Sequence, residues 1–223
     1  MTRHFEKAID HLKREILSLS TLVEEKLAKS MLAVKNLDAV SAQSIADSDQ
    51  EVDDKEVEIE EECLKILALY QPVAIDLRFV VAVLKINSDL ERIGDLSVNI
   101  ASRATALASS AHVTVPFDLN QFASKTKQLL RDSLQALINM DCDLAKKVCE
   151  LDLEIDALYK ATYQNVQKAI EKDPSVTNQI INYLSVARNL ERVADHATNI
   201  AEDVVYMIEG EIIRHRLDKV KDS

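Results

Sequence analysis

The chain has 223 residues, and its 38 Asp and Glu outnumber its 27 Lys and Arg to give a net charge of −11. This balance disfavours nucleic-acid binding, which needs clustered Lys and Arg, and attachment to an anionic membrane by charge alone. It permits cation binding. Hydrophobic residues make up 47% of the chain, whereas only 2 Gly, 3 Pro and no Trp occur. Many helix formers and few breakers predict an all-α protein built from long helices.

No segment reads as a targeting or membrane-spanning element. Residues 1–7 lack the apolar core of a signal peptide, and the longest apolar run, Phe79–Leu84, is too short to cross a bilayer. We therefore expect a soluble, cytoplasmic protein. The cysteines Cys63, Cys142 and Cys149 show no CxxC or Cys/His ligand spacing, so we expect reduced thiols that serve as small apolar residues.

Apolar residues at helical spacing predict three long helices in the first half of the chain. The first spans about residues 4–36. Asp38 is the expected N-cap of the second helix, which continues to Tyr70. Pro72 is expected at the first helical position of the third, which runs to about Ser109.

The second half repeats this order after a linker at the midpoint of the chain. Asp118 begins the fourth helix in a pattern like a capping box, and a fifth helix follows. Asp173-Pro174 starts the sixth, which we expect to run into the tail near Arg216. Short connections make neighbouring helices antiparallel. We therefore predict two tandem three-helix bundles, residues 1–112 and 116–223, each large enough to hold its own core.

One polar pattern occurs twice, at an interval of 100 residues. Leu90–Ala101 returns as Leu190–Ala201 with Leu, Glu, Arg, Asp, Asn, Ile and Ala in register. A repeated core would preserve only apolar positions, whereas this repeat also preserves polar side chains at i, i+4 and i+8. At about 100° per residue they form a stripe that faces away from the centre of its own bundle. The two stripes are Glu91, Asp95 and Asn99, and Glu191, Asp195 and Asn199.

A second acidic pattern also occurs twice, at an interval of 103 residues. Its members are Asp49 and Asp53 on the second predicted helix, and Asp152 and Asp156 on the fifth. Asp53 lies 19 residues before Pro72, and Glu91 lies 19 residues after it; around Pro174 the matching separations are 18 and 17 residues. Each residue rises about 1.5 Å along a helix. The two acidic pairs should therefore meet at nearly the same height on adjacent antiparallel helices, once in each half.

Four carboxylates brought together raise one another's pKa values and destabilise the fold unless a cation screens them. The functional interpretation is two metal sites, one per half, each formed by carboxylates on two helices. The alternative is a solvated acidic face on which Arg92 and Arg192 pair with Asp95 and Asp195 at i,i+3. A buried di-iron centre is disfavoured because the chain has no Glu-x-x-His. His196 is more typical of a surface histidine than of a ligand.

Three pieces of the chain carry a resemblance to a known family. Gln71–Arg78 reads QPVAIDLR, Asp89–Asp95 reads DLERIGD, and Asn189–Ala201 repeats the second piece. On these motifs the chain resembles the PhoU family over nearly its whole length. The resemblance implies tandem three-helix bundles, often as a homodimer, with metal bound at the surface by repeated E(D)xxxD motifs. Carried over to this sequence, the ligands are Asp49, Asp53, Glu91, Asp95, Asp152, Asp156, Glu191 and Asp195, with Asn99 and Asn199 beside them.

The resemblance also implies a role. PhoU-like proteins are negative regulators of the phosphate-starvation response that connect the ATP-binding subunit of a high-affinity phosphate ABC transporter to a PhoR-type sensor histidine kinase. We therefore expect a non-enzymatic regulator that acts through protein–protein contacts and holds a divalent or trivalent metal ion: iron, zinc, manganese, magnesium or nickel. Residues 173–178 lack the Asp-Leu-Arg of the first half, so a partner surface that used Arg78 would exist only in the first bundle.

Three alternatives stay open at this point: an accessory subunit of a low-affinity phosphate transporter, a metal-dependent enzyme of unknown substrate, and a helical scaffold without metal. A pocket beside the carboxylates with an open coordination position would favour the enzyme. A flat, exposed patch would count against it.

Overall fold

The structure is a computed structural model that describes residues 3–211. In that range the chain forms seven α-helices, one short 3-10 helix and no strand, which confirms the predicted all-α fold. No helix within it is both long enough and apolar enough to cross a lipid bilayer. The first half contains α1 (Arg3–Asn36), α2 (Ala39–Asp47), α3 (Gln50–Tyr70) and α4 (Ala74–Ala108). The second half contains α5 (Leu119–Asn139), α6 (Cys142–Lys172), η1 (Pro174–Val176) and α7 (Thr177–Glu209).

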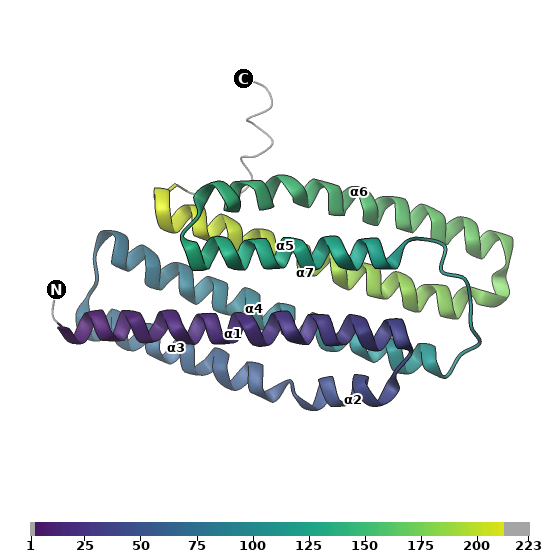
Figure 1. Cartoon of the computed structure of the whole chain (residues 1–223), viewed down its shortest axis with the longest axis horizontal. Helices are drawn as coiled ribbons and strands as arrows, with labels where there is room; N and C mark the ends of the chain where they lie inside the picture. The colour runs from purple at the N-terminus through teal and green to yellow at the C-terminus, as the bar shows by residue number, and fades with distance from the viewer. Residues whose placement is uncertain (1–2, 212–223) are drawn as a thin grey trace, which may run out of the picture.

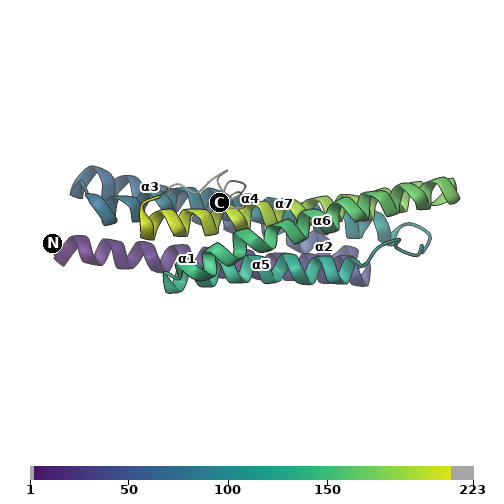
Figure 2. The ribbon, with the colours of Figure 1, turned by 90° about the horizontal axis from the view of Figure 1, so that it is seen from above.

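The long helices form two layers (Figure 1 and Figure 2). Helices α3, α4, α7 and α6 lie side by side in one layer, and α1 and α5 lie against one face of it. Helices α4 and α7, which carry the two copies of the polar motif, are neighbours at the centre of that layer. The two halves of the chain therefore meet along equivalent helices.

The buried apolar side chains of the two halves form one continuous core. Leu90 and Ile93 on α4 are fully buried, and Leu190 and Val193 on α7 are equally buried at the corresponding positions. The two halves, each predicted to be large enough to hold a core of its own, therefore share one core. The helices of the motif pack against each other as well as against their own bundles, so one core crosses the boundary between the halves.

Asp side chains cap the helices where the sequence predicts. Asp38 accepts hydrogen bonds from the backbone N–H groups of Val40 and Ser41, both at 3.0 Å. Asp118 accepts from the N–H of Gln121 at 2.9 Å. These bonds satisfy N–H groups that have no partner inside the helix, which fixes the starts of α2 and α5.

The second predicted helix is not continuous. It ends at Asp47 as α2 and resumes at Gln50 as α3. The reason lies on α1, where the Lys26 Nζ donates to Asp49 Oδ1 at 2.5 Å and to the Ser48 carbonyl oxygen at 3.5 Å. A carbonyl that binds an ammonium group is drawn away from the backbone N–H group it would bond inside a helix. The helix is therefore interrupted here although the sequence pattern is helical throughout.

The third predicted helix starts later than expected. Gln71 ends α3 in the left-handed conformation with φ 45°, and Ala74 is also left-handed with φ 51°. Val73 between them is extended, and α4 begins at Ala74. Pro72 and its neighbours form the turn in which the chain reverses direction between α3 and α4. Pro72 is therefore not the first helical residue.

The sixth predicted helix differs at both ends. Asp173 accepts from the N–H of Ser175 at the head of the 3-10 turn η1, and α7 itself begins at Thr177. At the other end Gly210 takes φ 76° and terminates the helix. Helix α7 therefore ends at Glu209, and the predicted end near Arg216 lies outside the described residues.

Candidate metal centre

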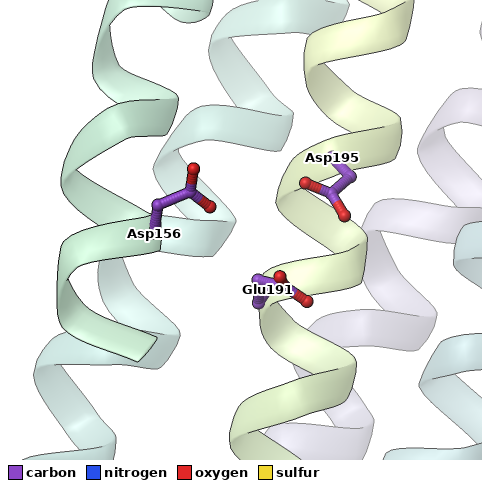
Figure 3. A group of neighbouring side chains, drawn as sticks. All are labelled: Asp156, Glu191 and Asp195. Carbon is purple, nitrogen blue, oxygen red and sulfur yellow. The ribbon is translucent and has the colours of Figure 1, made fainter. Parts of the chain in front are cut away.

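The second half brings three carboxylates together between α6 and α7 (Figure 3). Asp156 points from α6 toward Glu191 and Asp195, which lie one turn apart on α7. One oxygen from each side chain lies within 4.8 Å of the others, and no other group of three ligand-type side chains does so within residues 3–211. Asp156 and Glu191, predicted to have the same height, do meet. Glu191 is half-buried, whereas the two Asp side chains are exposed.

Asp152 lies one turn before Asp156 on α6 and is more buried. Burial raises the pKa of its carboxyl group to about 7, and the charges of Asp195, Asp156 and Glu191 add to the shift. Its Oδ1 atom is buried and accepts no hydrogen bond from the described residues. The nearby Thr198 hydroxyl nevertheless lowers the pKa of Asp152. The charged form of this side chain therefore lacks strong compensation from the protein.

The other members of this cluster are perturbed in the same direction. Partial burial raises the pKa of Glu191, the charges of Asp195 and Asp156 raise it further, and Arg188 and Arg192 lower it. Loss of solvent around its carboxyl group and the charge of Asp156 also raise the pKa of Asp195. A bound cation would favour the charged forms of these carboxylates. Because the donors are all carboxylate oxygens, they suit a hard or borderline metal ion.

The first half contains the four equivalent carboxylates, and they also influence one another. Partial burial raises the pKa of Asp95, with Asp49 and Asp53 adding to the shift. Partial burial, Asp95 and Asp53 raise the pKa of Glu91. Arg92 places its Nε 3.4 Å from Glu91 Oε2 and its Nη1 3.6 Å from Asp95 Oδ2. The i,i+3 ion pair of the alternative interpretation is therefore present in this half.

A second cation, which the sequence motifs do not predict, lies in the first cluster. Lys26 on α1 is only 3% exposed, and its Nζ lies 2.5 Å from Asp49 Oδ1. Its charge lowers the pKa of Asp95. The signal that could have found it is a lysine on the apolar side of its helix, between the buried residues Val23 and Leu27. A lysine in that position needs an acidic partner inside the fold.

The two Asn residues of the motif have different surroundings. Asn99 is exposed on α4. Asn199 is half-buried, and its Nδ2 donates to Asp89 Oδ1 at 3.2 Å. Asp89 belongs to α4, so the Asn199 amide is engaged at the contact between the two halves.

The contact between α4 and α7 holds further polar residues. His196 is not a surface histidine, because its Nδ1 lies 2.8 Å from Asp89 Oδ1 and its side chain is 20% exposed. The Lys85 Nζ donates to Asp203 Oδ1 at 3.1 Å, and Asp203 is almost fully buried. An open polar groove of about 700 Å³ runs beside these pairs and reaches Asp152 and Asp195. It gives solutes access to the second carboxylate cluster.

The three cysteines are free thiols. Cys63 and Cys149 are buried, and burial raises the pKa of each to about 12, so both act as the small apolar residues expected. Cys142 is partly exposed, and its Sγ lies 3.2 Å from Glu209 Oε1.

Comparison with known proteins agrees with this architecture. The family model for the PhoU domain matches residues 16–104 and 119–204, one match in each half. A phosphate-specific transport system accessory protein PhoU homolog from Clostridium acetobutylicum is 34% identical over 212 residues, which are 94% of this chain and 97% of the relative.

Two solved structures are similar along almost the whole chain. The crystal structure of PhoU from Pseudomonas aeruginosa has a TM-score of 0.90 and 31% identity, and the match covers 93% of this chain and 100% of that one. The crystal structure of the phosphate transport system regulatory protein PhoU from Streptococcus pneumoniae has a TM-score of 0.86 and 31% identity, with 93% and 98% covered. Because sequence and fold agree across both halves, the chain belongs to the PhoU family.

Proposed function

We propose that this protein is a regulatory accessory protein of phosphate transport. In this role it represses the phosphate-starvation response while phosphate is plentiful, by linking the ATP-binding subunit of a high-affinity phosphate ABC transporter to a PhoR-type sensor histidine kinase. The observation that carries the proposal is the match to PhoU proteins over both halves of the chain. Relatives over this length are named as accessory or regulatory proteins of phosphate transport.

Complementation tests the regulatory role. In a bacterium that has this pathway and lacks its own PhoU, phosphate-starvation genes are expected to stay active in phosphate-rich medium. Expression of this chain should restore repression, which a transcriptional reporter measures. A reporter that stays active while the folded protein accumulates would contradict the proposal. Co-purification with the ATP-binding subunit and with the kinase then tests the two contacts separately.

The second carboxylate cluster is proposed as a metal site. Asp152, Asp156, Glu191 and Asp195 supply oxygen donors from two helices, and the buried Oδ1 of Asp152 is the atom that most needs a cation. The metal would hold α6 and α7 together at the second carboxylate cluster and shape the surface that a partner protein contacts. The candidates remain iron, zinc, manganese, magnesium and nickel. A metal at the first cluster stays a prediction of the sequence.

Elemental analysis tests the metal proposal. Purified wild-type protein should contain metal, and a Glu191→Gln, Asp195→Asn variant should contain much less at the same helical content. Glu60→Gln changes one exposed carboxylate on α3 and serves as the control. Equal metal content in the wild type and the double variant would rule out a site at this cluster.

Two further expectations can be tested directly. The homodimer predicts a solution mass of twice the 25.0 kDa of the chain, measured by light scattering.

The metal-dependent enzyme keeps one observation in its favour, the open groove that reaches Asp152 and Asp195. Metal-loaded protein that restores repression and hydrolyses no phosphoester would count against a metal-dependent phosphoesterase.

A further inference from the structure

The two carboxylate clusters can be compared position by position, because the halves keep one register. Ser30 on α1 and Ser133 on α5 are 103 residues apart. Both are fully buried, and each hydroxyl donates to the carbonyl oxygen three residues earlier at 2.8 Å. The same interval relates Asp49 to Asp152. Equivalent residues of the two halves therefore occupy equivalent places in the fold.

In this register the buried Lys26 corresponds to Leu129. Both are almost completely buried, at 3% and 2% exposure. The Lys26 ammonium donates to Asp49 Oδ1, whereas the leucine at the matching position of the second half offers Asp152 no charge. The first cluster thus holds a cation that is part of the chain, and the second cluster has an apolar residue in its place.

The backbone differs at the same point. The Ser48 carbonyl oxygen accepts from the Lys26 Nζ, and the helix is interrupted between α2 and α3. In the second half α6 runs without a break through Leu151 and Asp152. The lysine therefore shapes the first cluster through both a carboxylate and a carbonyl. An external ion bound by Asp49 would have to displace an ammonium group that is shut away from water.

From these differences we propose that Lys26 is the resident cation of the first cluster, so that the second cluster alone binds an external metal ion. The two repeats then have different roles: one cluster is a permanent ion pair within the chain, and the other responds to metal. This inference rests on the proposed metal site at the second cluster.

Metal stoichiometry tests the inference. Equilibrium dialysis of the metal-free full-length protein against Mn²⁺ should give one ion per chain. The variant Lys26→Met should give two, because Asp49 and its neighbours lose their built-in cation. The control Lys29→Met changes an exposed residue of the same helix that pairs with Glu25 at the surface, so one ion should remain. The reverse variant, Leu129→Lys, should lose the ion of the wild type.

A measurement on the wild type keeps the test independent of whether the variants fold. Anomalous diffraction from crystals grown with Mn²⁺ should place the ion at Asp156, Glu191 and Asp195, with none at Asp53 and Glu91. An ion at both clusters, or no gain of a site in folded Lys26→Met, overturns this inference and leaves the proposed metal site intact. No bound ion in the wild type overturns the metal site and this inference together.

Discussion

His196 Nδ1 lies 2.8 Å from Asp89 Oδ1, which joins α7 of the second half to α4 of the first. Both side chains are largely shielded, at 20% and 15% exposure. A shielded polar pair across a helix contact should show energetic coupling. In a double-mutant cycle of His196→Ala and Asp89→Ala, we expect a coupling of about 1 kcal/mol in the free energy of unfolding. Urea denaturation measures it.

The control for this cycle is His112→Ala, which removes an exposed histidine of the linker. It should change stability by less than about 0.5 kcal/mol. Strictly additive effects of the two contact variants would show that the pair does not stabilise the junction between the halves.

Lys85 is expected to be important for stability. Its ammonium is bound to Asp203, whose side chain is 2% exposed, and lies 5.2 Å from the centre of the Tyr206 ring. Lys85→Met would leave a buried carboxylate without this cation, so we expect the free energy of unfolding to fall by about 2–3 kcal/mol. Lys29→Met, at an exposed pair, should cost at most about 0.5 kcal/mol. Similar losses in the two variants would contradict the argument.

Asp152 should make the stability of the metal-free protein depend on pH. Its pKa is raised from 3.8 to about 7 in the folded chain. Between these values the folded state binds more protons than the unfolded state, so the free energy of unfolding falls as pH rises. In EDTA, Asp152→Asn should be more stable than the wild type by about 1–2 kcal/mol at pH 8, after allowance for solvent screening, and the difference should vanish near pH 3.

The comparison is between two curves of stability against pH. Glu150→Gln alters an exposed residue of the same helix and should run parallel to the wild type. If the stability curve of Asp152→Asn is also parallel to that of the wild type, the Asp152 carboxyl group does not titrate between pH 3.8 and about 7.

Bound metal should offset the loss of stability that the charged Asp152 carboxylate causes. An ion that binds only the folded state stabilises it by about 2.7 kcal/mol at a free concentration one hundred times its dissociation constant. For a chain of this length, that corresponds to a rise in melting temperature of about 5–10 °C. The wild type should show the rise with Mn²⁺ and lose it in EDTA, and Glu191→Gln should show little of it. An identical rise in both proteins would place the effect elsewhere.

The local features of the fold could be predicted because they depend on neighbouring residues in the sequence. Asp38 and Asp118 begin helices as expected, since a cap is formed by a side chain and the N–H groups two or three residues later. The meeting of Asp156 with Glu191 could be predicted as well, because a short turn fixes the height of both residues on their helices.

Features that depend on distant segments could not be predicted. The break at Ser48 comes from Lys26, on another helix, and no local pattern in α2 or α3 announces it. The pair of His196 and Asp89 exists because α4 packs against α7, whereas the repeat alone does not say how the two bundles are placed. Proline is common at the first helical position, which is why Pro72 is expected there, but two left-handed residues in the turn delay the start of α4.

The pairing of α4 with α7 places equivalent helices of the two repeats against each other at the middle of the molecule. This is the arrangement of a two-fold symmetric pair of subunits, except that the linker makes them one polypeptide. In a homodimer of single repeats, any substitution in one subunit appears in the other. A single polypeptide has no such constraint. Lysine at position 26 can therefore coexist with leucine at position 129, and two sites of common design can specialise separately.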